Sequence, residues 1–446
     1  MISARDSWHL TGIVTACLCV GLYADGLDSP TGQSIACLMT AIALCAAIAV
    51  IRPPEEFWRI VRRPLFLIAA ALVWLLTVQA VRVGSPVRMS GLPLAPDLFL
   101  AKFLSIVAGL FALLTGAVLG WKAPRPNSAA GWILFFLCTH LVLGIGMSLM
   151  TCDGIWSAWT IVEHERFKGM IGNANVTAAM CAVGTILSFA CLMDLWTRAY
   201  RDGMSEVQHL FLGLFIASLL LNLIVLAMTA SRFPAVVTLA GMSLLIFSQR
   251  HLAAGRRYRR FWGPVAICVA AVAISQVFFS GLLVERIGNL EAETYSRTAA
   301  WNHFFDMAAS APWTGFGPGT FTIANLYYLQ EEAAGTGLWI VNSPHSILLQ
   351  LWFNGGIPYL LLMLAAAGMI FRDVCRRIDL GKGDAGIIGL FLAGVSVVAC
   401  AMVDIVLDYP VGTQIAFFLV GLAWTSSHNP KGRHLLAARR RMKTVK

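Results

Sequence analysis

The stretch HLFLGLFIASLLLNLIVLAMTASRFPAVVTLAGMSLLIFSQ, residues 209–249, contains two apolar runs separated only by the short connection TASRFP. The runs, 209–229 and 234–249, have the character of membrane-spanning helices, because about 20 apolar residues cross the hydrocarbon core of a bilayer. A connection this short makes the second run return across the membrane directly. The stretch therefore predicts two antiparallel spanning helices.

The rest of the chain has the same character. Of its 446 residues, 58% are hydrophobic and only 13% are charged, and the mean hydropathy is +0.74. Soluble domains are about 25% charged, so a water-soluble enzyme is excluded. Ten further apolar runs lie at 8–28, 32–51, 65–81, 98–119, 129–150, 171–195, 262–282, 346–371, 385–403 and 413–427. We predict an all-α polytopic membrane protein with about twelve transmembrane helices, forming a single integral membrane domain over residues 1–446.

The lysines and arginines separate between alternate connections of this topology. One side receives 25 of the 33, including the cluster at 250–260 and the basic tail at 428–446. The positive-inside rule assigns that side, with both termini, to the cytoplasm. These clusters set orientation and contact anionic headgroups; they lack the interleaved aromatic residues of a nucleic-acid site.

Eight cations fall on the external side instead. They are Arg82, Arg88, Lys102, Arg166, Lys168, Arg232, Arg286 and Arg297. Arg232 is the most informative, because TASRFP holds it at the membrane boundary. Cations gathered at an external membrane face predict an anionic ligand attached to a lipid. For Arg82, Arg88, Lys102 and Arg286, contact with the phosphates of a lipid acceptor and plain contact with headgroups both remain open.

Three helices that run inward begin on the external side. Ser231 precedes Arg232 and Pro234, and the stretch 172–175 offers Asn173 and Asn175 as caps for a second helix. The N-terminus of a helix carries unsatisfied N–H groups and about half a positive charge, which favours anions. Convergence of these starts would form a phosphate-binding face beside Arg232.

The third start is Ser-Pro-His. Ser343 is the predicted N-cap, Pro344 takes the first helical position, and His345 lies in the first turn. The positive end of a helix favours a neutral imidazole, which can accept a proton. The alternative is a boundary histidine that only solvates the helix end. His164 and His303, also external, have no such context.

The longest external connection spans 283–345, between the ninth and tenth spans. Within it a helical stripe of Ala300, Trp301, Phe304, Phe305 and Ala308 is predicted to lie on the membrane surface or to cap the site. The glycines and prolines of APWTGFGPGTF, residues 311–321, predict a tight irregular loop. Three aromatic residues in this loop, Trp313, Phe316 and Phe321, are expected to pack against other apolar residues. Stacking on a sugar is the less favoured alternative.

Several common catalytic motifs are absent. The sequence has no HExxH, no CxxC, no Walker loop and no GxGxxG between a strand and a helix. A less favoured alternative is that one of the external pairs, Glu163/Glu165 or Glu291/Glu293, binds a metal ion that is itself bound to a diphosphate. We expect no cofactor and no metal, and a lipid-linked diphosphate as donor in place of a nucleotide.

Four motifs occur in a familiar order. They are RFKGMIGNANVTAAM at 166–180, TASRFPAVV at 229–237, RTAAWNHFFDMAASAPWTGFGPGTF at 297–321 and NSPHSILLQLWFNGGIPYLLLM at 342–363. Together they resemble the O-antigen ligase/polymerase superfamily, and within it the bacterial lipopolysaccharide O-antigen ligases. Many members have proline where Ala174 stands.

The resemblance implies a function. Such ligases transfer a glycan from undecaprenyl diphosphate to a sugar of lipid A-core, at the periplasmic face of the inner membrane, and their fold resembles that of membrane glycosyltransferases with polyprenyl-linked donors (GT-C type). It implies that His345, Arg232 and Arg297 are catalytic and that the reaction needs no metal. The donor diphosphate would be bound by Arg166, Lys168, Arg232, Arg297, Asn173 and Asn175.

Three alternatives remain. A polymerase of the same superfamily shares the donor chemistry, and a protein O-oligosaccharyltransferase commonly extends further after the His motif. A transporter for lipid-linked sugars is disfavoured, because transporters show internal repeats and ionisable groups near the bilayer midplane.

Overall fold

The computed structural model describes residues 4–84, 96–122, 127–149, 162–163, 166–202, 205–249, 262–263, 265–266, 269, 290–329, 338–378 and 384–428. Its α-helices in these ranges are α1 (Ala4–Cys19), α2 (Pro30–Ile51), α3 (Glu55–Gly84), α4 (Pro96–Lys122), α5 (Asn127–Leu149), α6 (Ala174–Asp202), α7 (Glu206–Met228), α8 (Arg232–Ser248), α10 (Leu290–Ala309), α11 (Phe321–Tyr328), α12 (Ile347–Arg377), α13 (Ala385–Cys400) and α14 (Pro410–Ser426). Two short strands, β1 (Val162–Glu163) and β2 (Arg166–Phe167), form an antiparallel pair.

The polytopic all-α architecture is confirmed. Within the described ranges, seven helices are long and apolar enough to cross a membrane, and four more apolar helices are shorter. These eleven coincide with eleven of the twelve predicted runs. The remaining run, 262–282, lies almost wholly outside the described residues.

The helix ends assigned to the cytoplasm lie together. The Lys122 ammonium at the end of α4 donates to the Ile51 carbonyl at the end of α2, and the Ser426 hydroxyl at the end of α14 donates to the last turns of α4. Trp8 of α1 packs on Trp132 of α5 at the same level. The start of α1 and the end of α14 therefore share one side, called here the inner end. The outer end is where α6, α8 and α12 begin.

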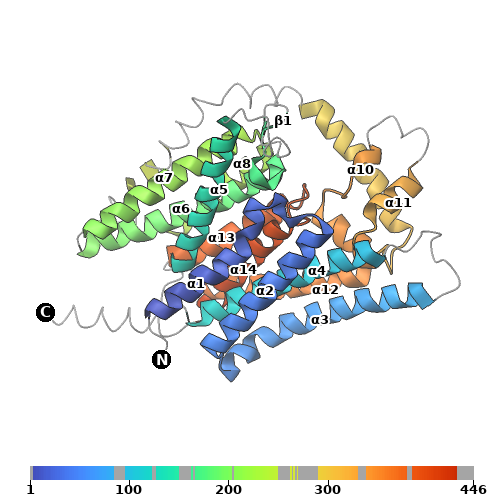
Figure 1. Cartoon of the computed structure of the whole chain (residues 1–446), viewed down its shortest axis with the longest axis horizontal. Coiled ribbons are helices and arrows are strands. Elements are labelled where there is room, and N and C mark those ends of the chain that lie inside the picture. Colours follow the sequence, from blue (N-terminus) through green and yellow to red (C-terminus); the bar gives the residue numbers. More distant parts are fainter. Residues whose placement is uncertain are drawn as a thin grey trace.

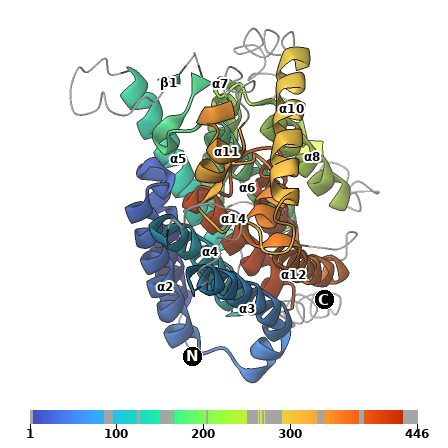
Figure 2. The ribbon, with the colours of Figure 1, turned by 90° about the vertical axis from the view of Figure 1, so that its right-hand side faces the viewer.

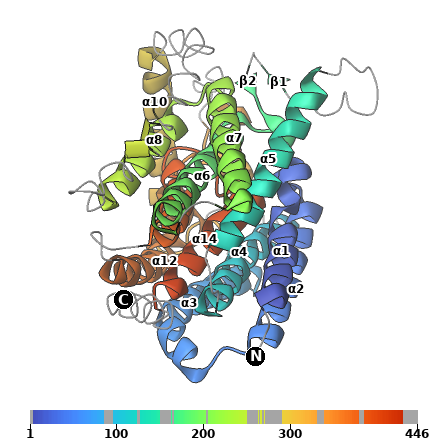
Figure 3. The same cartoon turned by 90° about the vertical axis from the view of Figure 1, so that its left-hand side faces the viewer.

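Helix α6 occupies the middle of the bundle. Its membrane-spanning part is wholly buried inside the protein, whereas α2 and α3 leave most of their surface to lipid. Figures 2 and 3, which view the molecule from opposite sides, both show α6 and α14 near its centre. The start of α6 is thus fixed by neighbours on every side.

Helices α4 and α14 cross at van der Waals contact. A Cβ atom on Gly116 would lie 2.1 Å from the Phe418 carbonyl oxygen, and one on Gly421 would lie 2.0 Å from the Leu113 oxygen. Small residues allow this approach where lipid supplies no hydrophobic driving force between helices. The Thr425 hydroxyl strengthens the contact by donating to the Ala117 carbonyl at 2.6 Å.

Helix α12 is broken near its outer end. Gly355 and Gly356 have non-helical dihedral angles, and Pro358 offers no N–H to the Asn354 carbonyl. The loop after α10 supplies the missing partners: the N–H groups of Phe316 and Gly317 donate to the carbonyls of residues 353 and 354. The N–H of residue 357 in turn donates to the carbonyl of residue 312 at 2.8 Å. Such a break is tolerated at membrane depth when every freed backbone group finds a partner.

The described part of the segment 283–345 packs as a unit on α12. Phe304 and Met307 of α10, Phe321 of α11 and Phe353 of α12 share one buried cluster. Figure 1 shows α10 and α11 beyond the bundle, on the side where α12 and α4 begin. The apolar stripe of α10 thus packs largely against protein, although Phe305 on the same helix stays exposed.

The predicted start of α12 is wrong. The helix begins at Ile347 with Ser346 as N-cap, so Ser343 is not the cap and Pro344 and His345 lie outside the first turn. The N–H of Ile347 bonds the Ala401 carbonyl at 2.8 Å. This tertiary bond satisfies a donor of the opening turn and sets the helix start after the histidine.

Candidate functional site

Asn173 caps α6 at the outer end. Its Oδ1 accepts the N–H groups of Asn175 at 2.9 Å and Val176 at 3.1 Å, which is the N-cap pattern. Asn175 is not a cap. Its Nδ2 donates to Oδ2 of Asp404 at 2.5 Å, in the connection between α13 and α14. The start of α6 is therefore tied to that connection by a side chain that points away from its own helix.

Arg166, on β2, joins the starts of α6 and α8. Its Nε donates to the Thr229 carbonyl at 2.9 Å, and one terminal nitrogen donates to Asn175 Oδ1 at 2.6 Å and Ser231 Oγ at 2.9 Å. Ser231 is the N-cap residue of α8, as predicted, but its hydroxyl donates to Asn175 at 2.7 Å and makes no capping bond. Charge-assisted bonds of this kind are short and strong, so Arg166 holds two helix N-termini together.

His345 lies beside Asp404. Its Nδ1 is 3.7 Å from Asp404 Oδ1, which also accepts the N–H of Ile405 at 2.8 Å. The histidine side chain is 40% exposed, whereas the carboxylate is 12% exposed. The separation exceeds a hydrogen bond, as catalytic contacts often do before substrate binds. An accessible imidazole thus has a buried carboxylate at its Nδ1 face.

The backbone of His345 is strained. Its φ of 50° lies in the left-handed region, which costs a non-glycine residue on the order of 1–3 kcal/mol and persists where surrounding contacts enforce it. Two contacts do so here: the Ser343 hydroxyl donates to Asp408 Oδ2 at 2.5 Å, and the N–H of Ile347 bonds Ala401. The turn is pinned on both sides of the histidine.

Lys102 is half-buried and lies at the other carboxylate oxygen of Asp408. Its ammonium donates to the Asp408 carbonyl at 3.0 Å and lies 3.3 Å from Oδ1 of the same residue. A small cavity of about 10 Å³ lies between these segments and is lined by Ser343, Gln350, Asp404 and Asp408, among other residues. Such a volume holds about one water molecule.

Arg232 is the first residue of α8 and is half-buried. It follows Ser231 directly, so its backbone stands next to the Arg166 network. Arg297 lies in α10, on the unit that packs over α12, but its side chain is outside the described residues. The structure therefore places Arg232 beside the clustered helix starts.

The other predicted contacts divide between described and undescribed residues. Lys168 is half-buried near the Asp25 carboxylate. Arg82 is in α3 with its side chain outside the described residues, and Arg88 and Arg286 lie outside them altogether. So do the side chains of the two Glu-x-Glu pairs. In the remaining, described side chains there is no group of three or more His, Cys, Asp or Glu able to hold a metal.

The aromatic residues of the 311–321 loop play different parts. Phe316 and Phe321 are buried in the cluster around Phe353, while Trp313 is 65% exposed. Gly315, Gly317 and Gly319 all have positive φ, as the predicted irregular loop requires. Of the three candidates for sugar stacking, only Trp313 presents its ring to the surroundings.

Two further carboxylates, Asp25 and Asp28, lie near the lysines of the outer end. Burial raises the pKa of Asp28; the Lys102 ammonium opposes that rise, and the Asp408 and Asp25 carboxylates add to it. Burial likewise raises the pKa of Asp25, against the effect of Lys168, and that of the Tyr409 hydroxyl. Two of the predicted phosphate contacts, Lys102 and Lys168, therefore already lie near a carboxylate of this protein.

Sequence reasoning missed Asp404 and Asp408. Both lie in the connection VDIVLDYP at 403–410, between two apolar runs. The available signal was two carboxylates four residues apart at a membrane boundary, where a charge is costly unless it has a partner. Their partners come from α4, α6 and the turn before α12, so no local spacing pointed to them.

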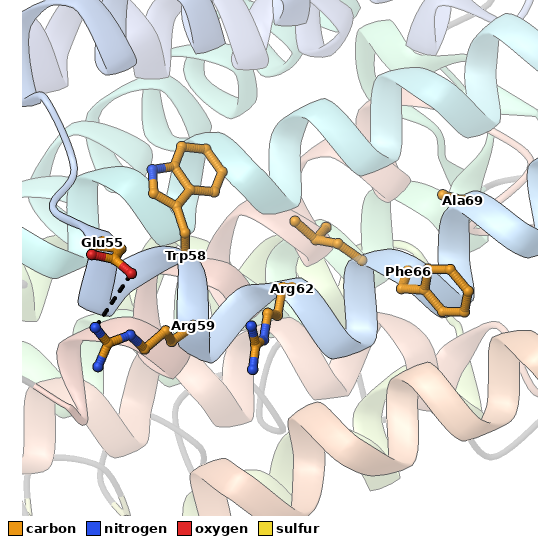
Figure 4. Close-up of a pocket in the computed structure, with 7 residues that line it drawn as sticks. Glu55, Trp58, Arg59, Arg62, Phe66 and Ala69 are labelled. Carbon is orange, nitrogen blue, oxygen red and sulfur yellow. Dashed lines mark hydrogen bonds and ion pairs between the residues drawn. The ribbon is translucent and has the colours of Figure 1, made fainter.

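A larger hollow of about 440 Å³ lies elsewhere, on the inner half of α3. Figure 4 shows Trp58, Arg59, Arg62 and Phe66 strung along this one helix, with Arg59 paired to Glu55. Because one helix supplies the whole lining, the hollow is part of the lipid-facing surface near the inner end. It has no connection with the histidine.

Comparison with known protein families gives a match. Residues 216–364 match the family model described as O-antigen ligase. The matched segment runs from α7 into α12 and includes Arg232, Arg297 and His345, whereas Arg166, Asn175 and Asp404 lie outside it. No curated protein matches the chain. This match shows that the chain carries an O-antigen ligase family domain over residues 216–364, within a polytopic membrane protein.

Proposed function

We propose that this protein is an O-antigen ligase, which transfers a glycan from undecaprenyl diphosphate to a sugar hydroxyl of lipid A-core at the periplasmic face of the bacterial inner membrane. The observation that carries the proposal is the position of His345. Its exposed imidazole lies 3.7 Å from the buried Asp404 carboxylate, beside the starts of α6 and α8. This position supports a general base next to an anion-binding face.

His345 is the proposed general base. A sugar hydroxyl is a poor nucleophile until its proton is removed, and a positioned base is worth about 10²–10⁴-fold in rate. With Nδ1–H directed to Asp404, the Nε2 lone pair faces outward to accept that proton. The carboxylate then stabilises the imidazolium that forms, in the manner of a base oriented by a third group.

The diphosphate is the proposed leaving group, and the positive helix ends are its proposed binding face. Arg232 at the first position of α8 adds a full charge to the partial charge of that N-terminus. Arg297, carried over α12 by α10, is the proposed second arginine. The side chains of Arg166, Asn173 and Asn175 are bonded within the protein. We therefore propose that their main role is to hold this face together, and that direct contact with phosphate is a secondary role.

The proposed reaction is one displacement. The acceptor oxygen bonds to the anomeric carbon as the bond from that carbon to the diphosphate oxygen breaks, the electron pair leaves with undecaprenyl diphosphate, and the hydroxyl proton goes to His345. Charge grows on the diphosphate in the transition state, where fixed positive groups stabilise it most. Attack from the face opposite the leaving group inverts the anomeric centre; a product that keeps the donor's configuration would rule out a single displacement.

The test uses a strain from which the gene is deleted. Loss of a ligase leaves bare lipid A-core with polymer stranded on the carrier, whereas loss of a polymerase leaves core bearing one repeat. Complementation with the wild-type gene should restore polymer on the core, and His345→Ala should not. His209→Ala, on the exposed first turn of α7 at the inner end, is the matched control and should restore it fully. Core with a single repeat in the deletion strain would assign the chain to the polymerases.

A further inference from the structure

The turn that carries His345 is bonded to the connection between α13 and α14 through a serine. The Ser343 hydroxyl donates to Asp408 Oδ2 at 2.5 Å and lies 3.2 Å from Oε1 of Gln350, and Ser343 itself is buried. His345, two residues later, has the left-handed φ of 50°. Any movement of Asp408 is therefore passed to the backbone that aims the imidazole.

Lys102 fixes the position of Asp408. The ammonium bonds both the backbone carbonyl and the carboxylate of this residue, at 3.0 and 3.3 Å, so it restrains main chain and side chain together. The side chains of Lys102 and Asp408 are only 19% and 17% exposed. A shielded ion pair of this kind is costly to break, because removing one charge leaves the other buried without a partner.

The lysine also stands between two carboxylates. Asp28, before α2, is close enough to Lys102 for the ammonium to lower its pKa, even though burial outweighs that effect. The charge of Lys102 is therefore balanced from within the protein. This argues against the expectation that Lys102 binds a phosphate of the lipid acceptor, since an incoming phosphate would compete with Asp408.

We infer that Lys102 is a positioning residue, which acts through Asp408 and Ser343 to hold His345 in its reactive orientation. The inference rests on the proposed function of His345. Lys102 is far from His345 in the sequence. Three segments are joined by the relay: α4 supplies the lysine, the connection 401–409 supplies Asp408, and the turn before α12 supplies the serine. Neither Lys102 nor Asp408 lies in the segment that matches the family.

The test is a double-mutant cycle on the purified full-length protein. Lys102→Met keeps the length of the side chain and removes its charge, Ser343→Ala cuts the relay at its other end, and Ser343→Thr keeps the hydroxyl. The substrates are lipid-linked glycan and lipid A-core, each varied so that kcat and KM are obtained separately. Lys122→Met is the matched control, because this second lysine of α4 also bonds a carbonyl, at the inner end.

A positioning relay gives a specific pattern. Lys102→Met and Ser343→Ala should each lower kcat by about 10–100-fold, with KM for both substrates changed less than about threefold, because a misplaced base costs chemistry more than binding. The double variant should lose no more than the worse single variant. Ser343→Thr should recover most of the rate, and Lys122→Met should retain it.

Other patterns overturn the inference. If Lys102 binds an acceptor phosphate, Lys102→Met raises the KM for lipid A-core and leaves kcat near the wild-type value. The rise in KM is then the same whether or not Ser343→Ala is also present. If the two sites act separately, their losses multiply in the double variant. If Lys102→Met does not fold, Ser343→Ala without a loss in kcat is sufficient to reject the relay. Wild-type protein that transfers no glycan at all would count against the proposed function, which separates the two failures.

Discussion

Asp404 presents one carboxylate oxygen to each side of the site. Oδ2 accepts the Asn175 amide at 2.5 Å, and Oδ1 lies 3.7 Å from Nδ1 of His345. The carboxylate thereby connects the arginine-bonded start of α6 to the one histidine that the motifs single out. A buried carboxylate held in this way orients an imidazole and stabilises its protonated form.

Asp404→Asn should reduce glycan transfer by about 10–100-fold while the protein still binds donor. Asn175 Nδ2 donates to Oδ2 of Asp404, so the amide of the new asparagine would place its oxygen at that position to accept the same bond. Its NH2 group would then replace Oδ1, where it faces the Ile405 N–H and Nδ1 of His345. An NH2 at that place favours the imidazole tautomer with its proton on Nε2, which cannot accept a proton from the acceptor. Rates at saturating donor and acceptor measure the effect; unchanged kcat would remove Asp404 from the mechanism.

Arg166→Lys should destabilise the protein by about 1–3 kcal/mol. The planar guanidinium of arginine bonds Thr229, Ser231 and Asn175 at once, and the single ammonium of lysine cannot make all three bonds. Thermal unfolding in detergent measures the change. Arg59→Lys, in the exposed pair with Glu55, is the matched control and should shift stability by less than about 1 kcal/mol. Equal shifts in the two variants would show that the Arg166 network does not hold the helix starts.

Gly356→Ala should prevent accumulation of folded protein. A Cβ atom there would lie 2.2 Å from the Trp313 carbonyl oxygen, and φ is 74°. Gly368→Ala, in the same helix with nothing within 4 Å, should fold normally and gain up to about 1 kcal/mol from helix propensity. Membrane yield and size-exclusion profiles compare the two. A well-folded Gly356→Ala protein would show that the loop does not pack into the break of α12.

Stability should fall as pH rises from about 3.8, the ordinary pKa of an aspartate, through the raised pKa of Asp28. The folded protein binds more protons than the unfolded chain within that window, so unfolding becomes easier with pH and the penalty is complete above it. Asp28→Asn should remove this part of the pH dependence and raise the unfolding temperature at neutral pH. Asp97→Asn, an exposed carboxylate of α4, should leave the profile unchanged. Identical pH profiles for Asp28→Asn and the wild type would contradict the burial of that charge.

The spans were predictable because lipid imposes a simple rule. An apolar run of about 20 residues must form its backbone hydrogen bonds internally, and so becomes a helix whatever its neighbours are. The start of α8 at Arg232 and the cap at Asn173 also follow from local sequence. The start of α12 did not, because a tertiary bond from Ile347 to Ala401 decides it.

The polar core of the site was less predictable. Lys102 was expected to face lipid phosphate, and its partner Asp408 is 306 residues away in the chain. Asp404 meets Asn175 across 229 residues. Pairings of this range depend on which helices pack together, and hydropathy gives the number of helices without giving their neighbours.

The most direct test of the central claim is transfer by purified protein. Wild type, His345→Ala and His209→Ala would each be given undecaprenyl-diphosphate-linked O-antigen and lipid A-core, without nucleotide and with a chelator present. We predict polymer on the core for the wild type and for His209→Ala, and a loss of about 10²–10⁴-fold in rate for His345→Ala with donor binding retained. Transfer by His345→Ala at the wild-type rate would contradict the claim that this histidine activates the acceptor.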